Sequence, residues 1–366
     1  LLATGNGRCN LTNIFLNKSN FHGEDNSFVD FLLKKFDFVA CKDFFREIGL
    51  EIVEGSQGRC YPLSLHARSV VDILYKACIY HKVEFYMERA AEKIIFKNSN
   101  FLICTGKEEF KTKKLLIATG GKAAPSLGGN EDGLRLAKSL GHRIISTFPT
   151  LVQLTTSDKN IHLASGAKLV CALQIKVNNL LVQSIEGDVL FTKYGLSGSA
   201  ILDISRNATY ALKNGEKVEI VLDLFPKTSK QELMKLLEMR LEKAEYLSTL
   251  SWLGGILNPI LVPPIVKIMN LKKEEKFPKE KKVLRQLIYH LKNWNILIDG
   301  DRGFKGAEVM AGGVDVREVD EKTMASKLHE GLYFSGEVLD IDGDCGGYNL
   351  HFAWASGLCA GEAMAN

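Results

Sequence analysis

Residues 331–361 read GLYFSGEVLDIDGDCGGYNLHFAWASGLCAG, and this stretch decides the fold. Its apolar start, 332–334, predicts a short buried strand, and a helix of small residues begins near Gly347. A glycine-rich turn joins the strand to the helix. Such an arrangement lets the backbone approach an anionic cofactor closely. We therefore expect a cofactor-binding turn at this end of the chain.

The turn also carries four acids, Glu337, Asp340, Asp342 and Asp344. Carboxylates accept hydrogen bonds from ribityl or ribose hydroxyl groups, so these side chains suit a cofactor that carries a sugar. A calcium loop is the alternative, because the three aspartates alternate along the chain. The EF-hand pattern requires glycine at the sixth loop position, where this chain has Cys345. We therefore predict no metal site.

Composition excludes several classes of function. Of the 366 residues, 46% are hydrophobic and 25% are charged, which is typical of globular proteins. The formal net charge of +4 is too small to indicate a nucleic acid or an anionic membrane as partner. The eight cysteines form no C-x-x-C pair, which excludes the common dithiol motif and most zinc sites. No run of about 18 apolar residues occurs. We predict a cytoplasmic protein with a small-molecule substrate.

Glycine turns occur at two further places. An apolar strand at 114–118 ends in Thr119-Gly120-Gly121, and a helix follows. A buried strand that ends in glycines before a helix is typical of a cofactor cleft at the carboxyl edge of a parallel sheet. The chain opens with LLATGNGRCNLTN at 1–13, where two glycines permit a close-approaching loop. Taken alone, that G-x-G fits a plain surface loop equally well.

The remaining patterns predict local elements. We expect one helix over 28–48 and a short strand at 83–87. Short apolar runs separated by turns over 151–224 are typical of an antiparallel barrel or sandwich. Ser229 is placed to cap a helix that ends near residue 245. The run 272–282 alternates between lysine and glutamate, so we interpret it as a solvated helix face rather than an RNA site.

Five blocks, in this order, carry a family resemblance: ATGNGRCNLTN at 3–13, GRCYP at 58–62, ATGGKAAPSLGGNEDG at 118–133, LFTKYGLSGSAIL at 190–202, and EVMAGGVDVREVDEKTMASKLHEGLYFSGEVLDIDGDCGGYNLHFAWASG at 308–357. Together they resemble the bacterial NAD(P)/FAD-dependent oxidoreductases of the aminoacetone oxidase-type FAD-binding family.

The resemblance implies an α/β fold: a Rossmann-like FAD domain of the glutathione reductase class, interrupted by an inserted β-barrel and a small helical subdomain. The domains implied are an FAD-binding domain at 1–149 and 310–366, a barrel at 150–226, a helical subdomain at 227–293 and return strands at 294–309. The family begins with a βαβ unit carrying G-x-G-x-x-G, which is absent here. We therefore expect an N-terminally truncated chain, with an open edge or apolar groove where the first strand would lie in the sheet.

The resemblance also implies the site. Residues expected to bind FAD are Thr4, Gly5, Asn6, Arg8, Cys9, Asn10, Ala91, Thr119, Gly120, Gly121, Gly336, Glu337, Asp340, Gly346, Gly347, Tyr348 and Asn349. Candidates for catalysis are Arg59, Tyr61 and His351, because their blocks should line the cleft. His351 stands where a glutamine is common in the family, and a surface-facing histidine is the alternative interpretation.

The function implied is FAD-dependent oxidation or reduction of a small molecule, through amine oxidation or NAD(P)H-linked reduction, with NAD(P)H as a candidate electron donor. The alternative is a non-catalytic fragment or degenerate homologue that keeps the fold without binding FAD. A third hypothesis, an RNA-modifying flavoprotein, requires a basic surface with aromatic residues, which the sequence does not show. All three expect the opening loop and the last turn to lie together.

Overall fold

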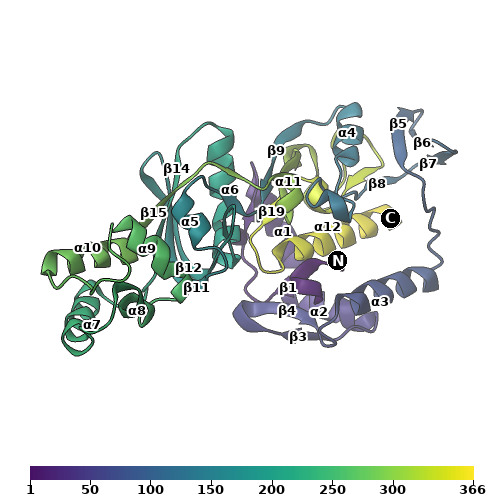
Figure 1. The fold of residues 1–366 in the computed structure, drawn as a ribbon. Helices are drawn as coiled ribbons and strands as arrows, with labels where there is room; N and C mark the ends of the chain where they lie inside the picture. The colour runs from purple at the N-terminus through teal and green to yellow at the C-terminus, as the bar shows by residue number, and fades with distance from the viewer. The chain divides into compact units, whose positions relative to one another are not determined.

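The computed structural model describes residues 1–366, which divide into two compact units (Figure 1). Unit 1 consists of Leu1–Phe148 with Val309–Asn366, and unit 2 of Pro149–Glu308. No helix is long and apolar enough to cross a membrane. The finer division of 150–309 into three parts stays a prediction.

Two parallel strands are central to unit 1. Strand β8 (Leu115–Ile117) pairs with β18 (Leu332–Phe334), which confirms both predicted buried strands. Helix α12 (Tyr348–Ala365) follows β18, and α4 (Asp132–Ser139) follows β8. Strand β8 has no second neighbour, so its other edge carries no strand, as the resemblance led us to expect.

The chain before β8 forms smaller pieces of unit 1. Strands β1 (Thr12–Asn13), β4 (Arg59–Pro62) and β3 (Ile52–Glu54) make an antiparallel sheet in the order β1-β4-β3. The helix expected over 28–48 is wrong as a single helix. The backbone leaves helical geometry at Phe36, and the Asp37 side chain then accepts a hydrogen bond from the Ala40 N–H and caps a second helix.

Helix α3 and the segment that follows it expose many apolar side chains. Tyr80 at the end of α3 (Ala67–Tyr80) is 82% exposed, and Met87 is 75% exposed. The strand predicted at 83–87 is wrong, because that segment pairs with no other strand.

The other elements of unit 1 are short. They are α1 (Val29–Lys35), α2 (Phe38–Glu47), β2 (Phe21–His22) paired with β19 (Asp342–Gly343), β9 (Ile144–Thr150) paired with β17 (Val309–Val314), and the sheet of β5 (Ala91–Lys97), β6 (Asn100–Thr105) and β7 (Glu109–Thr112).

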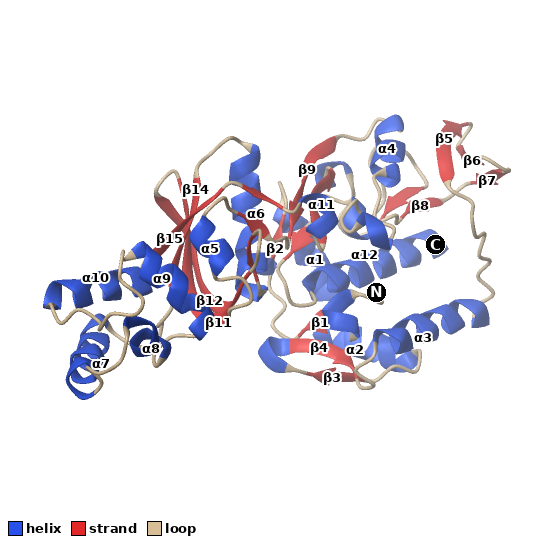
Figure 2. Cartoon of the chain, viewed as in Figure 1, coloured by secondary structure: helices blue, strands red, loops and turns tan.

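Unit 2 contains one seven-stranded sheet in the order β15-β14-β11-β12-β13-β10-β16. Figure 2 shows strands in red and labels β11, β12, β14 and β15 of this sheet. Its strands are β10 (Leu154–Thr155), β11 (Lys168–Val177), β12 (Leu180–Phe191), β13 (Gly195–Ser197), β14 (Val218–Asp223), β15 (Trp294–Ile298) and β16 (Gly300–Asp301). The end strands β15 and β16 do not pair, so the expected barrel is not formed. Helix α6 (Ser199–Lys213) covers the sheet, and Ala200 fits against Gly187 of β12, which explains why no second layer of strands is needed.

Helices complete the core of unit 2. They are α5 (Lys159–Leu163), α7 (Lys230–Lys243), α8 (Thr249–Gly254), α9 (Val262–Ile268), α10 (Lys281–Lys292) and α11 (Gly303–Gly306). Ser229 and Glu232 form a capping box at the start of α7, which confirms the predicted cap. Leu233 of α7 and Leu287 of α10 belong to the same buried cluster as the sheet residue Leu173.

Candidate active site in unit 1

The opening segment lies against the start of α12. The Asn13 amide Nδ2 donates a hydrogen bond of 3.0 Å to the Gly346 carbonyl, and the Trp354 indole donates one of 3.0 Å to the Leu11 carbonyl. The Asn10 side chain reaches back to the Cys60 N–H at 3.1 Å. The two glycine-bearing ends of the chain therefore meet through residues 10–13 and 346–354.

Glycine is required where these segments touch. A Cβ on Gly347 would lie 2.6 Å from the Thr12 carbonyl oxygen, and Gly347 has φ of +101°. The N-cap residue of α12, Gly347, makes no side-chain capping bond, and the positive end of the helix dipole lies at this terminus. The loop Thr4–Gly7 contributes a second left-handed stretch, with φ of +57° at Gly5 and +56° at Asn6.

Side chains fix the rest of the last turn. Asn349 exchanges two hydrogen bonds of 2.8 Å with the backbone of Gly343, and the Tyr348 ring packs edge-on against Phe21. The Gly336 N–H donates to the Ser356 hydroxyl at 3.0 Å. The turn between β18 and α12 is thus held without any group outside the chain.

Glu337 joins the last turn to the glycine turn that follows β8. Its Oε1 accepts a hydrogen bond of 2.6 Å from the Met310 N–H, and a Cβ on Gly121 would lie 3.1 Å from the same oxygen. Burial raises the pKa of Glu337 to about 7, against the partial compensation of backbone N–H groups. This carboxyl group therefore keeps its proton to a higher pH than an exposed glutamate does.

The turn after β8 packs against α4. A Cβ on Gly133 of α4 would lie 1.8 Å from the Thr119 hydroxyl oxygen, so the helix meets the turn at a glycine. Arg135 of α4 donates a hydrogen bond of 2.6 Å to the Glu92 carbonyl, next to Ala91 at the start of β5. Ala91 and Thr119 therefore lie against the same helix. Beside Gly120, whose φ is +71°, a Cβ would meet no atom within 4 Å.

Two of the acids are already used inside the fold. The Asp340 side chain is 2% exposed and accepts a hydrogen bond of 2.9 Å from the Glu24 N–H. Asp344 lies 2.7 Å from Nε2 of His22. Their carboxylates tie the early residues 20–24 to the last turn, a role that the sequence pattern did not reveal.

Arg59 and Tyr61 lie on one face of β4. Side chains two residues apart on a strand share a face, so Arg59 and Tyr61 extend from the same side of β4. The Arg8 guanidinium lies over that ring at 4.6 Å from its centroid, and Gly5 and Gly55 leave room for the ring edges. The Arg59 side chain has no hydrogen bond or ion pair within the chain. A cation without a partner in the chain, on the same strand face as a phenol, is suited to binding an oxygen that becomes negative.

His351 is not a surface residue. Its ring is fully buried, with Nε2 2.8 Å from the Phe36 carbonyl and Nδ1 2.9 Å from the Thr12 hydroxyl. A carbonyl oxygen can only accept, so Nε2 carries the proton and Nδ1 accepts from Thr12. Both nitrogens are used by the fold, and the surface-facing interpretation is wrong. Burial lowers the pKa of His351 to about 4.

Replacing His351 with glutamine should reduce the loss in free energy of unfolding that occurs as the pH is lowered from 8 to 5. The folded chain resists protonation of His351 above pH about 4, whereas the unfolded chain binds that proton near its ordinary pKa of 6.5. Stability is therefore lost as pH falls through this window, by about 2 kcal/mol at pH 5. Urea unfolding at pH 5 and pH 8 should show that loss reduced in His351→Gln. An unchanged difference would contradict the neutral, buried ring.

Comparison with known proteins agrees with the geometry. The chain matches the HI0933-like protein Rossmann domain over residues 1–363, and it belongs to this family of FAD-dependent oxidoreductases. It is 34% identical to the 3-dehydro-bile acid delta(4,6)-reductase of Clostridium scindens, covering 100% of this chain and 89% of that protein.

Two further relatives have another name. The ribosomal RNA dihydrouridine synthases of Haemophilus influenzae and Escherichia coli are each 28% identical; the matches cover 97% and 100% of this chain and 87% and 89% of those proteins. A solved structure of an E. coli quinol fumarate reductase FrdA variant matches with a TM-score of 0.42 and 14% identity over 93% of this chain and 57% of that chain.

Sequence reasoning missed several residues of this site. Thr12 and Asn13 lie inside the first resemblance block, yet only the structure shows that they contact His351 and Gly346. Met310 contributes a backbone N–H, which no side-chain pattern can reveal.

Proposed function

We propose that this enzyme binds FAD where its opening segment meets the last turn, and reduces a carbon–carbon double bond conjugated to a carbonyl group. The observation that carries the proposal is the contact of residues 10–13 with residues 346–351, two segments from opposite ends of the chain. Neither segment, considered by itself, predicts that it packs against the other.

The residues present suit FAD. Open space lies beside Gly120, whose left-handed backbone allows a ligand to approach closely, while Gly5 and Gly347 let the chain's own segments pack together around it. The uncapped N-terminus of α12 favours an electron-rich edge, and the carboxyl group of Glu337 is suited to a ribityl hydroxyl. When bound, the flavin supplies hydride transfer, with NAD(P)H as the proposed electron donor.

The names of the relatives support the reaction type. A 3-dehydro-bile acid delta(4,6)-reductase and a dihydrouridine synthase both add hydrogen to a carbon–carbon double bond next to a carbonyl system. In this chain Arg59 would hold the carbonyl oxygen, where negative charge develops during reduction. Tyr61, held by Arg8 over its ring, would supply the proton from its hydroxyl group.

The flavin claim is tested by absorbance. The purified chain mixed with FAD and desalted should keep flavin bands at roughly 375 and 450 nm, the cofactor's own absorption. A protein that returns colourless while its circular dichroism shows a folded chain would favour the non-catalytic alternative instead.

Arg59→Ala should lower kcat/KM for a conjugated ketone, such as a 3-dehydro-bile acid with delta(4,6) double bonds, by about 100-fold, as removal of one oxyanion donor does elsewhere. Flavin absorbance should stay unchanged, because Arg59 is assigned to the substrate. Arg46→Ala is the matched control, since Arg46 is a half-exposed arginine paired with Asp43 and Glu51. Equal activity of the two variants would remove Arg59 from the mechanism.

A further inference from the structure

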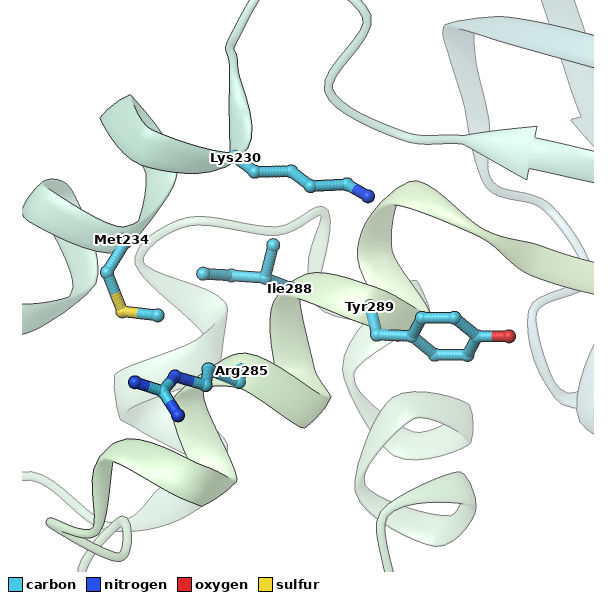
Figure 3. A pocket seen from close by; sticks show the side chains of 5 residues that line it. All are labelled: Lys230, Met234, Arg285, Ile288 and Tyr289. Carbon is cyan, nitrogen blue, oxygen red and sulfur yellow. The ribbon is translucent and has the colours of Figure 1, made fainter.

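A groove in unit 2 lies between α7 and α10 and uses none of the proposed flavin site. Its volume is about 260 Å³, and it is lined by Lys230 and Met234 of α7 with Arg285, Ile288 and Tyr289 of α10. Figure 3 shows Lys230 and Arg285 on opposite sides of Ile288, with the Tyr289 ring to one side of them. The groove thus combines an apolar floor, two cations and an aromatic ring.

The two cations of the groove are unpaired. Lys230 and Arg285 make no hydrogen bond or ion pair with their side chains within the chain. The neighbouring cations are matched, since Lys281 lies 3.2 Å from Glu238 and Lys292 lies 2.7 Å from Asp223. The remaining acid near the start of α7, Glu232, accepts a hydrogen bond from the Ser229 N–H in the capping box. A negatively charged ligand would therefore complement this groove.

The exposed aromatic ring indicates which class of anionic ligand suits the groove. Tyr289 is 60% exposed on α10, next to Arg285 four residues earlier on the same helix face. An exposed ring beside cations is the arrangement on which unpaired bases stack while their phosphates are neutralised. A small acid would be left largely in water here, whereas small-molecule sites bury most of their ligand.

The geometry points to this groove as a binding site for single-stranded RNA, with phosphates at Lys230 and Arg285 and a base on Tyr289. The aromatic basic surface that the sequence lacks is assembled from two helices that are far apart along the chain. RNA binding at this groove goes beyond the proposed function. It rests on the proposed function only if the bound RNA is the substrate that the enzyme reduces.

The test is fluorescence anisotropy with a labelled single-stranded RNA of about 12 nucleotides. The full chain should bind it, and log K should fall against log salt with a slope of about −1.4 for two phosphates. In Lys230→Ala/Arg285→Ala the slope should approach zero, and Tyr289→Ala should weaken binding by about tenfold. The control, Lys235→Ala/Lys282→Ala, removes two exposed cations from the same helices outside the groove and should bind as the parent does.

Three results would overturn the inference. They are no anisotropy change at any protein concentration, equal loss in the groove and control variants, and tighter binding of a labelled poly-glutamate than of the RNA at the same salt concentration, which would make the groove a site for acidic peptides. Flavin absorbance is recorded on the same samples. RNA binding without flavin bands would refute the proposed function alone, and flavin bands without RNA binding would refute the groove alone.

Discussion

Replacing Gly347 with alanine will remove flavin absorbance from the reconstituted protein. The new Cβ would lie 2.6 Å from the Thr12 carbonyl, and the residue has φ of +101°, where a side chain is strained by about 1–2 kcal/mol. The opening segment must therefore move away from the start of α12. Absorbance after desalting measures the effect, and circular dichroism shows whether the fold survives.

Gly361→Ala is the matched control on the same helix. A Cβ on Gly361 meets no atom within 4 Å, and alanine favours a helix over glycine by up to about 1 kcal/mol. This variant should keep its flavin and unfold at an equal or higher temperature. Full flavin binding by Gly347→Ala would show that the contact of the two ends does not make the site.

Glu337→Gln will remove a loss of stability that the parent chain undergoes as the pH rises toward neutrality. Glu337 keeps its proton in the folded state up to pH about 7, whereas the unfolded chain loses it near the ordinary pKa of 4.5. Raising the pH through this window therefore costs the parent stability, by about 2 kcal/mol between pH 5 and pH 8. Glutamine keeps a carbonyl oxygen for the Met310 N–H and has no proton to lose.

Urea unfolding of both proteins without added FAD, at pH 5 and pH 8, measures this difference. Subtracting the two chains removes the contribution of His351, which has the opposite sign and acts at lower pH. A gap between the chains that stays constant with pH would mean that Glu337 is ionised throughout.

Elements with strong local signals could be predicted from the sequence. The apolar strands that became β8 and β18 end in glycines, and Ser229 with Glu232 specifies the start of α7. The uninterrupted pattern over 28–48 misled because Asp37 can cap a helix as well as lie within one. Which of the two occurs depends on packing with other parts of the chain.

Helix α6 had no such signal. It buries Ser205 and Thr209, whose hydroxyl groups are satisfied by backbone carbonyls of their own helix. Polar residues on the buried face weaken the helical period, so the segment was grouped with the short strands around it. The expected barrel failed for the same reason, because the helix covers the sheet in place of more strands.

The glycine turns of the site could be predicted from the sequence, whereas the side chains that lie beside them could not. A glycine turn predicts that the backbone closely approaches a ligand or another segment. It does not predict which other residues lie at the same place. The face shared by Arg59 and Tyr61 follows from strand alternation once β4 is known, whereas the position of Arg8 over the ring depends on the loop. The groove at Lys230 and Arg285 depends on how two helices pack, which no single stretch encodes.

The unpaired side of β8 has a consequence for how this molecule behaves in concentrated solution. A strand that offers unmatched N–H and C=O groups is a template for the addition of another strand. Tyr80 and Met87 in the same unit add exposed apolar surface, which favours association. We expect copies of this chain to associate through that edge as concentration rises. Light scattering over a concentration series measures the association, and a short β-forming peptide that occupies the edge should reduce it.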